Sequence, residues 1–132
     1  MDKEKLALLF ELTFSAKTTS EILEAEKSLS LLSTNPSFLR TLFEIISDPT
    51  KNLETKPRLK AIKKAATLFL KKFIDESLEN DENLKHDTLY FFSQIVCEGL
   101  YNENVSTANK SQFLIILNKL MLNDLSKITN FL

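Results

Sequence analysis

Apolar residues recur along most of the chain at the three- and four-residue spacing that places them on one face of an α-helix. No stretch shows the two-residue alternation of a half-buried strand, and the polar turns lack the dipeptides of β-hairpins. We expect helices over residues 3–15, 18–32, 36–47, 57–74, 84–100 and 107–122, followed by a short last helix over residues 124–132. The sequence therefore predicts an all-α protein.

Three of these helices begin at residues that suit the free amides of a first turn. Thr18 and Glu21 have the spacing of a capping box, in which the threonine hydroxyl accepts from a first-turn amide and the glutamate accepts from the cap amide. Asn35 with Pro36 marks another start, and Pro57 marks a third. Because so few residues separate the first two helices, we expect them to form an antiparallel hairpin.

Each predicted helix has an apolar face that we expect in the core. The main core positions are Leu6, Leu9, Phe10, Thr13, Phe14, Ile22, Ala25, Leu29, Leu32, Phe38, Leu39, Leu42, Phe43, Ile45, Ile46, Leu59, Ile62, Ala66, Phe69, Leu70, Phe73, Leu89, Phe92, Ile95, Val96, Leu100, Phe113, Ile116, Leu117 and Leu120. Hairpins of about 30 to 45 residues have the size of an α-solenoid repeat. We expect about three antiparallel pairs stacked as one domain over residues 1–132.

The helix predicted over residues 57–74 separates apolar from basic side chains. Its basic side consists of Lys60, Lys63, Lys64, Thr67 and Lys71. One interpretation is a solvated face lying near the acidic segment 75–87, which we expect to be a loop between helices. The other is a contact surface that attracts an acidic partner and speeds association more than it raises affinity. Both remain open from the sequence.

Composition limits the classes of function. The chain has 132 residues, 43% of them apolar and 27% charged, which is typical of a folded globular domain. A net charge of −1 argues against binding nucleic acid through the overall electrostatic field. No run of about 18 apolar residues occurs, and the apolar part of the N-terminus is interrupted by Glu11. We therefore expect neither membrane insertion nor a secretory signal.

Residues for catalysis are scarce. The single glycine excludes a phosphate-binding loop, and His86 has no second histidine or thiolate at ligand spacing. Cys97, the only cysteine, is expected to be a buried structural thiol, because one histidine is too little for a nucleophile and base pair. The ten phenylalanines lie within apolar helix faces, which favours core packing over base stacking. We expect a protein that is no enzyme and has no metal or cofactor.

Four segments, taken in order, resemble the N-terminal domain of the importin-β superfamily of nuclear transport receptors. They are the leucine-rich residues 5–14, AEKSL at 25–29, NPSFLRTLFEII at 35–46 and AATLFLKKFI at 65–74. The family has a leucine-rich helix, an A-E-x-x-L helix, a P-x-F-x-x-x-L helix and a helix ending in A-A-x-x-x-L-K-N-x-I. The family's usual arginine falls on Lys63 and its asparagine on Lys72, and the tryptophan that often follows is absent.

This resemblance implies a function in protein transport between cytoplasm and nucleus. Receptors of the family are long solenoids of HEAT repeats, whose N-terminal repeats bind the small GTPase Ran in its GTP form. Cargo and nuclear-pore proteins engage mainly repeats further along. The resemblance also implies that the second helix of each pair faces the partner, which would place Lys60, Lys63, Lys64, Thr67 and Lys71 on or beside the Ran-binding surface.

A self-contained helical adaptor or scaffold, binding a peptide or a lipid surface, is the alternative. The two hypotheses differ in what they expect of the last helix, because a complete array ends on a polar face. Ile128, Phe131 and Leu132 would instead form an apolar edge, which favours a piece of a longer receptor.

Overall fold

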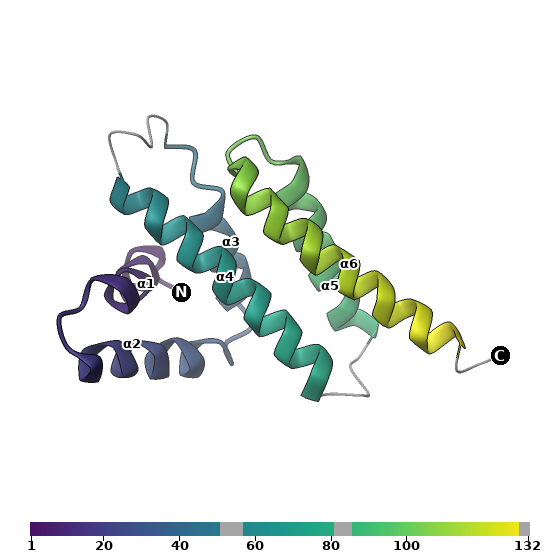
Figure 1. The fold of residues 1–132 in the computed structure, drawn as a ribbon, viewed down its shortest axis with the longest axis horizontal. Coiled ribbons are helices and arrows are strands. Elements are labelled where there is room, and N and C mark those ends of the chain that lie inside the picture. Colours follow the sequence, from purple (N-terminus) through teal and green to yellow (C-terminus); the bar gives the residue numbers. More distant parts are fainter. Residues whose placement is uncertain (51–56, 81–85, 130–132) are drawn as a thin grey trace. The chain divides into compact units, whose positions relative to one another are not determined.

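The computed structural model describes residues 1–50, 57–80 and 86–129 (Figure 1). Side chains are described within these ranges except at residues 86 and 124–129. The helices are α1 (Lys3–Ser15), α2 (Thr19–Leu32), α3 (Phe38–Ile46), α4 (Pro57–Asn80), α5 (His86–Tyr101) and α6 (Thr107–Thr129). The described residues include no strand, and helices adjacent in the chain pack in pairs. The predicted all-α class is confirmed.

The chain divides into two compact units, Met1–Ala66 and Thr67–Leu132, and the boundary falls within α4. In the first unit α1 packs against α2 and α3. In the second, α5 packs against α6, and Figure 1 shows these two helices side by side. The prediction of one repeat domain over residues 1–132 stays a prediction.

The first helix pair is fixed by two caps and a small apolar core. The Asp2 carboxylate accepts hydrogen bonds from the backbone N–H groups of Glu4 and Lys5, at 2.9 and 3.3 Å. The Thr18 hydroxyl accepts from the N–H of Glu21 at 3.2 Å, which confirms the threonine half of the predicted capping box. Four of the expected core side chains of α1 and α2 are buried: Leu6, Phe10, Ala25 and Leu29. The other expected positions are not: Phe14 is exposed, and Leu9, Thr13, Ile22 and Leu32 are only half-buried.

Helix α3 begins two residues later than predicted, at Phe38. Asn35 forms a turn instead of capping the helix, since its side-chain oxygen accepts from the N–H and the hydroxyl of Ser37 at 3.0 and 2.9 Å. The prediction for its core is confirmed, because all six expected residues are buried. A short helix with so many apolar residues must contact neighbours on most of its circumference.

Helix α4 continues well past the predicted end at Ile74, as far as Asn80. The prediction of a loop from residue 75 is therefore wrong for Asp75, Glu76 and Glu79, which lie in the helix. Residues 75–80 contain neither glycine nor proline, so nothing in this stretch breaks the helix. Lys72 and Glu76 form an i,i+4 pair at 3.9 Å. Residues 81–85 of the acidic segment, and 51–56 of the predicted linker before α4, lie outside the described residues.

In the second unit, contacts on both α5 and α6 hold the end of α4. The rings of Phe73 and Phe92 meet edge to face with centroids 6.2 Å apart. Lys119 of α6 donates to the Asp75 carboxylate at 2.7 Å. Seven of the nine expected core residues of α5 and α6 are buried, namely Leu89, Phe92, Ile95, Val96, Phe113, Ile116 and Leu120, whereas Leu100 and Leu117 are only half-buried.

Gly99, the single glycine of the chain, lies near the C-terminal end of α5. A Cβ at this position would lie 2.7 Å from the ring of Phe113, which is fully buried. The absence of a side chain therefore allows α5 and α6 to approach closely at this point.

Two further sequence predictions need correction. Cys97 is exposed, so it is not the buried structural thiol that we expected. Helix α6 runs without a break from Thr107 to Thr129, so residues 124–129 form its last turns and no separate helix begins there. No glycine or proline interrupts this stretch. The apolar edge predicted from Ile128, Phe131 and Leu132 rests on side chains outside the described residues.

Candidate functional site

The five residues predicted on the basic side of α4 have different environments. Lys60 and Lys64 are exposed, and Lys71 is half-buried. Lys63 and Thr67 are buried, with only 3% and 0% of their surface exposed. Lys60, Lys63 and Lys64 belong to the first unit, whereas Thr67 and Lys71 belong to the second. Of the five residues, the exposed lysines in the first unit are therefore Lys60 and Lys64, one helical turn apart.

The buried face of α4 differs from the predicted apolar face. It is rotated about the helix axis toward the side that carries the lysines. It consists of Ile62, Lys63, Ala66, Thr67, Leu70 and Ile74. Leu59, Phe69 and Phe73, which we expected at the centre of the apolar face, are only half-buried. The prediction that Lys63 shares an exposed face with Lys60 is therefore wrong. A helical wheel places every lysine on the polar side of a helix. It contains no information about the acceptor that the ammonium group of Lys63 has elsewhere in the fold.

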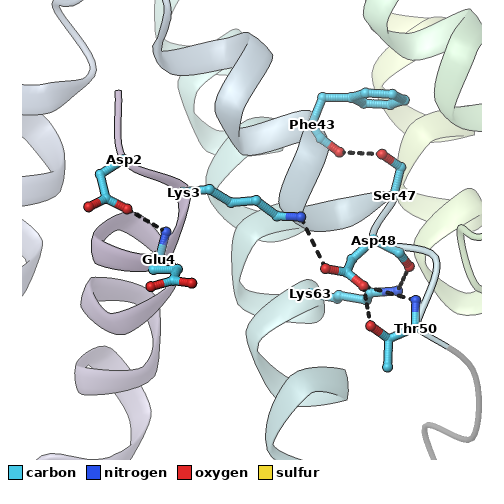
Figure 2. Close-up of polar contacts among 8 residues, drawn as sticks. All are labelled: Asp2, Lys3, Glu4, Phe43, Ser47, Asp48, Thr50 and Lys63. Carbon is cyan, nitrogen blue, oxygen red and sulfur yellow. Dashed lines mark hydrogen bonds and ion pairs between the residues drawn. The ribbon is translucent and has the colours of Figure 1, made fainter.

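That acceptor belongs to the chain just after α3. The Lys63 ammonium donates to the backbone carbonyl oxygen of Asp48 at 2.6 Å (Figure 2). Burial lowers the pKa of Lys63, and the negative charge of Asp48 opposes this shift. An ammonium at this position also suits the negative end of the α3 dipole. Lys63 thus stabilises the end of α3 against α4.

The carboxylate of Asp48 accepts further hydrogen bonds from α1 and from its own turn. Lys3 donates to its carboxylate at 3.0 Å, and the Thr50 N–H donates at 2.9 Å (Figure 2). The Thr50 hydroxyl donates to the same carboxylate oxygen as the Thr50 N–H. Burial acts to raise the pKa of Asp48, but the hydrogen bonds from Thr50 and Lys3, with the Lys3 charge, lower it to about 2. We call Lys3, Asp48, Thr50 and Lys63 the polar clamp.

The exposed lysines are available to a partner. Neither Lys60 nor Lys64 forms an ion pair with any described residue, whereas Arg58 at the start of α4 is paired with Glu11 of α1. Two like charges one turn apart repel each other and attract an acidic surface. The described residues contain no group of three His, Cys, Asp or Glu side chains able to hold a metal ion. Nor does any described helix have the length and apolarity required to cross a bilayer.

Comparison with protein families gives one match. A family model described as the importin-beta N-terminal domain matches residues 25–95, more than half of the chain. The chain belongs to this family. The family comprises N-terminal domains of importin-β-type nuclear transport receptors, and it is not an enzyme family. Searches of curated proteins and of solved structures found no match.

The matched region begins in α2 and ends in α5. It therefore includes α3, all of α4 and three members of the polar clamp, while Lys3 lies before it. The resemblance noted in the sequence ended at Ile74, so the family pattern extends further into the second unit than the quoted motifs did. No local pattern in the sequence indicated the roles of Lys3 and Asp48, because the two residues are 45 positions apart in the chain and only the fold brings them together.

Proposed function

We propose that this importin-β N-terminal domain binds the small GTPase Ran in its GTP form, as the N-terminal part of a nuclear transport receptor. Family membership is the observation that supports this proposal most directly, because domains of this family bind Ran-GTP. Cargo and nuclear-pore proteins would then engage repeats further along the receptor, which would move between cytoplasm and nucleus.

The contact that we propose on this chain is the exposed pair Lys60 and Lys64. Both side chains are solvated and lack ion pairs with described residues, so a partner's carboxylates can reach them without breaking internal bonds. Lys63 and Thr67 are instead parts of the buried face of α4. Lys71, which is half-buried, remains a proposed contact of the second unit.

Equilibrium binding to two nucleotide forms of Ran tests the proposal. The chain is titrated against fluorescently labelled Ran loaded with GDP or with a non-hydrolysable GTP analogue. We expect the GTP form to bind at least about tenfold more tightly, a difference of about 1.4 kcal/mol. Ras loaded with the same analogue is the control and is expected not to bind. Equal affinity for both forms of Ran, or no binding to either, contradicts the proposal and favours an adaptor of another kind.

A further inference from the structure

Helix α5 has an exposed face that combines tyrosines with acids. Tyr90 and Tyr101 are 63% and 89% exposed, so most of each side chain is in water. Their spacing of 11 residues is about three helical turns, which places both rings on one side of the helix. The core residues of α5 lie on the opposite side. We call the exposed side the tyrosine face, and it consists of Asp87, Tyr90, Gln94, Cys97, Glu98 and Tyr101.

The charge on and around the tyrosine face is negative. From residue 86 to residue 109 the sequence has three acids and neither lysine nor arginine. The three acids, Asp87, Glu98 and Glu103, are all exposed. Asp87 and Glu103 form no ion pair within the described ranges. Of the two lysines that bound this stretch, Lys110 is half-buried on α6 and Lys85 lies outside the described residues. The face therefore attracts a basic partner and repels an acidic one.

Each tyrosine has an exposed acid close to it in the chain. Asp87 precedes Tyr90 by three residues, so the two side chains are neighbours on the helix surface. Glu103 follows Tyr101 by two residues, in the turn after α5. An arginine can stack its guanidinium group on an aromatic ring and also pair with a carboxylate. Each end of the face therefore suits one arginine.

The distance between the two tyrosines limits the shape of a partner. Eleven residues of α-helix rise about 16 Å. An extended chain advances about 3.3 Å per residue, so it covers this distance in about five residues. A segment that reaches both tyrosines therefore has its basic residues about five positions apart.

We propose that the tyrosine face binds a basic protein segment in an extended conformation, with one arginine or lysine on Tyr90 and another, about five residues away, on Tyr101. Charge complementarity selects this occupant, because the described side chains of α5 include acids and no base. Tyrosine and arginine are also enriched among the residues that dominate the energetics of protein interfaces. The face shares no residue with Lys60 and Lys64, so the proposal does not depend on Ran binding.

Two fluorescently labelled peptides of equal composition test the proposal with the full chain. RRSGSRR places one pair of arginines four to six residues from the other, whereas RRRRSGS has the same four arginines together. We expect RRSGSRR to bind at least about threefold more tightly, as measured by fluorescence anisotropy at low salt. Equal affinities for the two peptides, or no binding of either, overturn the proposal.

Substitution of both tyrosines tests the aromatic contacts. Tyr90→Ala/Tyr101→Ala is expected to weaken binding of RRSGSRR at least about fivefold, whereas Tyr90→Phe/Tyr101→Phe retains the rings and most of the affinity. Phe14→Ala is the matched control, because Phe14 is an aromatic residue of α1 that is 46% exposed. Circular dichroism checks that each variant is folded. Unchanged affinity of the double alanine variant, or equal weakening in the control, overturns the proposal.

Substitution of the acids tests the charge contacts. Asp87→Asn/Glu103→Gln is expected to weaken binding of RRSGSRR about threefold and to reduce its salt dependence. Glu24→Gln/Glu26→Gln is the control, because these acids are exposed on α2 and the change in net charge is the same. An equal effect of the two double variants would show that the peptide responds to net charge and not to the tyrosine face, which overturns the proposal.

Discussion

At the scale of single residues, Lys63 shows how one buried hydrogen bond changes the role of a side chain. Its neighbours Lys60 and Lys64 are exposed, but Lys63 reaches the Asp48 carbonyl and is 3% exposed. A lysine stem packs well against apolar groups, so the cost of burying it lies in the ammonium. The hydrogen bond to the Asp48 carbonyl offsets part of that cost. Without it, the ammonium would be buried with no acceptor, and the carbonyl would lose its donor.

Replacing Lys63 by methionine tests this dependence. The apolar stem is retained, but the Asp48 carbonyl loses a buried donor, so we expect a loss of about 1 to 3 kcal/mol in the free energy of unfolding. Lys60→Met is the matched control, because Lys60 is exposed on the same helix, and we expect a change within about 0.5 kcal/mol. Urea unfolding followed by circular dichroism measures both. Similar values for the two variants would show that the ammonium of Lys63 contributes no stability.

The Asp48 carboxylate makes stability depend on pH in the acid range. Its pKa in the folded chain is about 2, below the ordinary value of 3.8, so the unfolded chain binds the proton more readily. The stabilisation is complete above about pH 5 and is lost as the pH falls through 3.8 toward 2, by about 1 kcal/mol after allowance for solvent screening of this partly exposed carboxylate. Asp48→Asn removes the titrating group. The difference in stability between this variant and the native chain should therefore shrink as the pH falls to 2. A constant difference between the two proteins from pH 6 to pH 2 would contradict this assignment.

At the scale of elements, the sequence predicts best where apolar residues are dense. The six core residues of α3 were predicted correctly because almost any helical orientation buries them. The orientation of α4 was not predictable from periodicity alone, since its buried face includes Lys63 and Thr67. Its C-terminal end was missed because a run of acids was interpreted as solvated loop, although Asp75 pairs with Lys119 of α6. Contacts between distant parts of the chain decided both features.

The contact between α5 and α6 at Gly99 gives a prediction at this scale. An added Cβ would lie 2.7 to 2.9 Å from three ring atoms of Phe113, which is fully buried and has little room to move. We expect Gly99→Ala to destabilise the chain by about 1 to 3 kcal/mol from overpacking, partly offset by about 1 kcal/mol of helix propensity.

Thermal unfolding of Gly99→Ala, alone and combined with Phe113→Leu, measures the effect. The smaller leucine makes room for the new methyl group, so the double variant should be more stable than the two separate losses predict. Additive losses, or a stabilised Gly99→Ala, would show that the helices do not approach closely at this residue.

At the scale of the whole molecule, the net charge of −1 is a sum over local surfaces that differ in charge. The family was predictable because the order of its motifs along the chain is more specific than any one of them. The candidate site was predictable only in part: Lys60 and Lys64 are exposed as expected, whereas Lys63 belongs to the polar clamp.

The association rate of the chain with Ran in its GTP form shows whether Lys60 and Lys64 form the proposed contact. We measure this rate for the native chain and for Lys60→Glu/Lys64→Glu, at low salt and at about 0.15 M salt. A double variant outside α4, Lys5→Glu/Lys17→Glu, has the same change in net charge and serves as the control.

We expect the α4 variant to associate at least about tenfold more slowly than the native chain at low salt, and with a weaker salt dependence, because charge steering is strongest between facing surfaces. The control should retain most of the native rate. An association rate of the α4 variant equal to the native rate, or an equal decrease of the rate in both variants, would contradict the proposed contact.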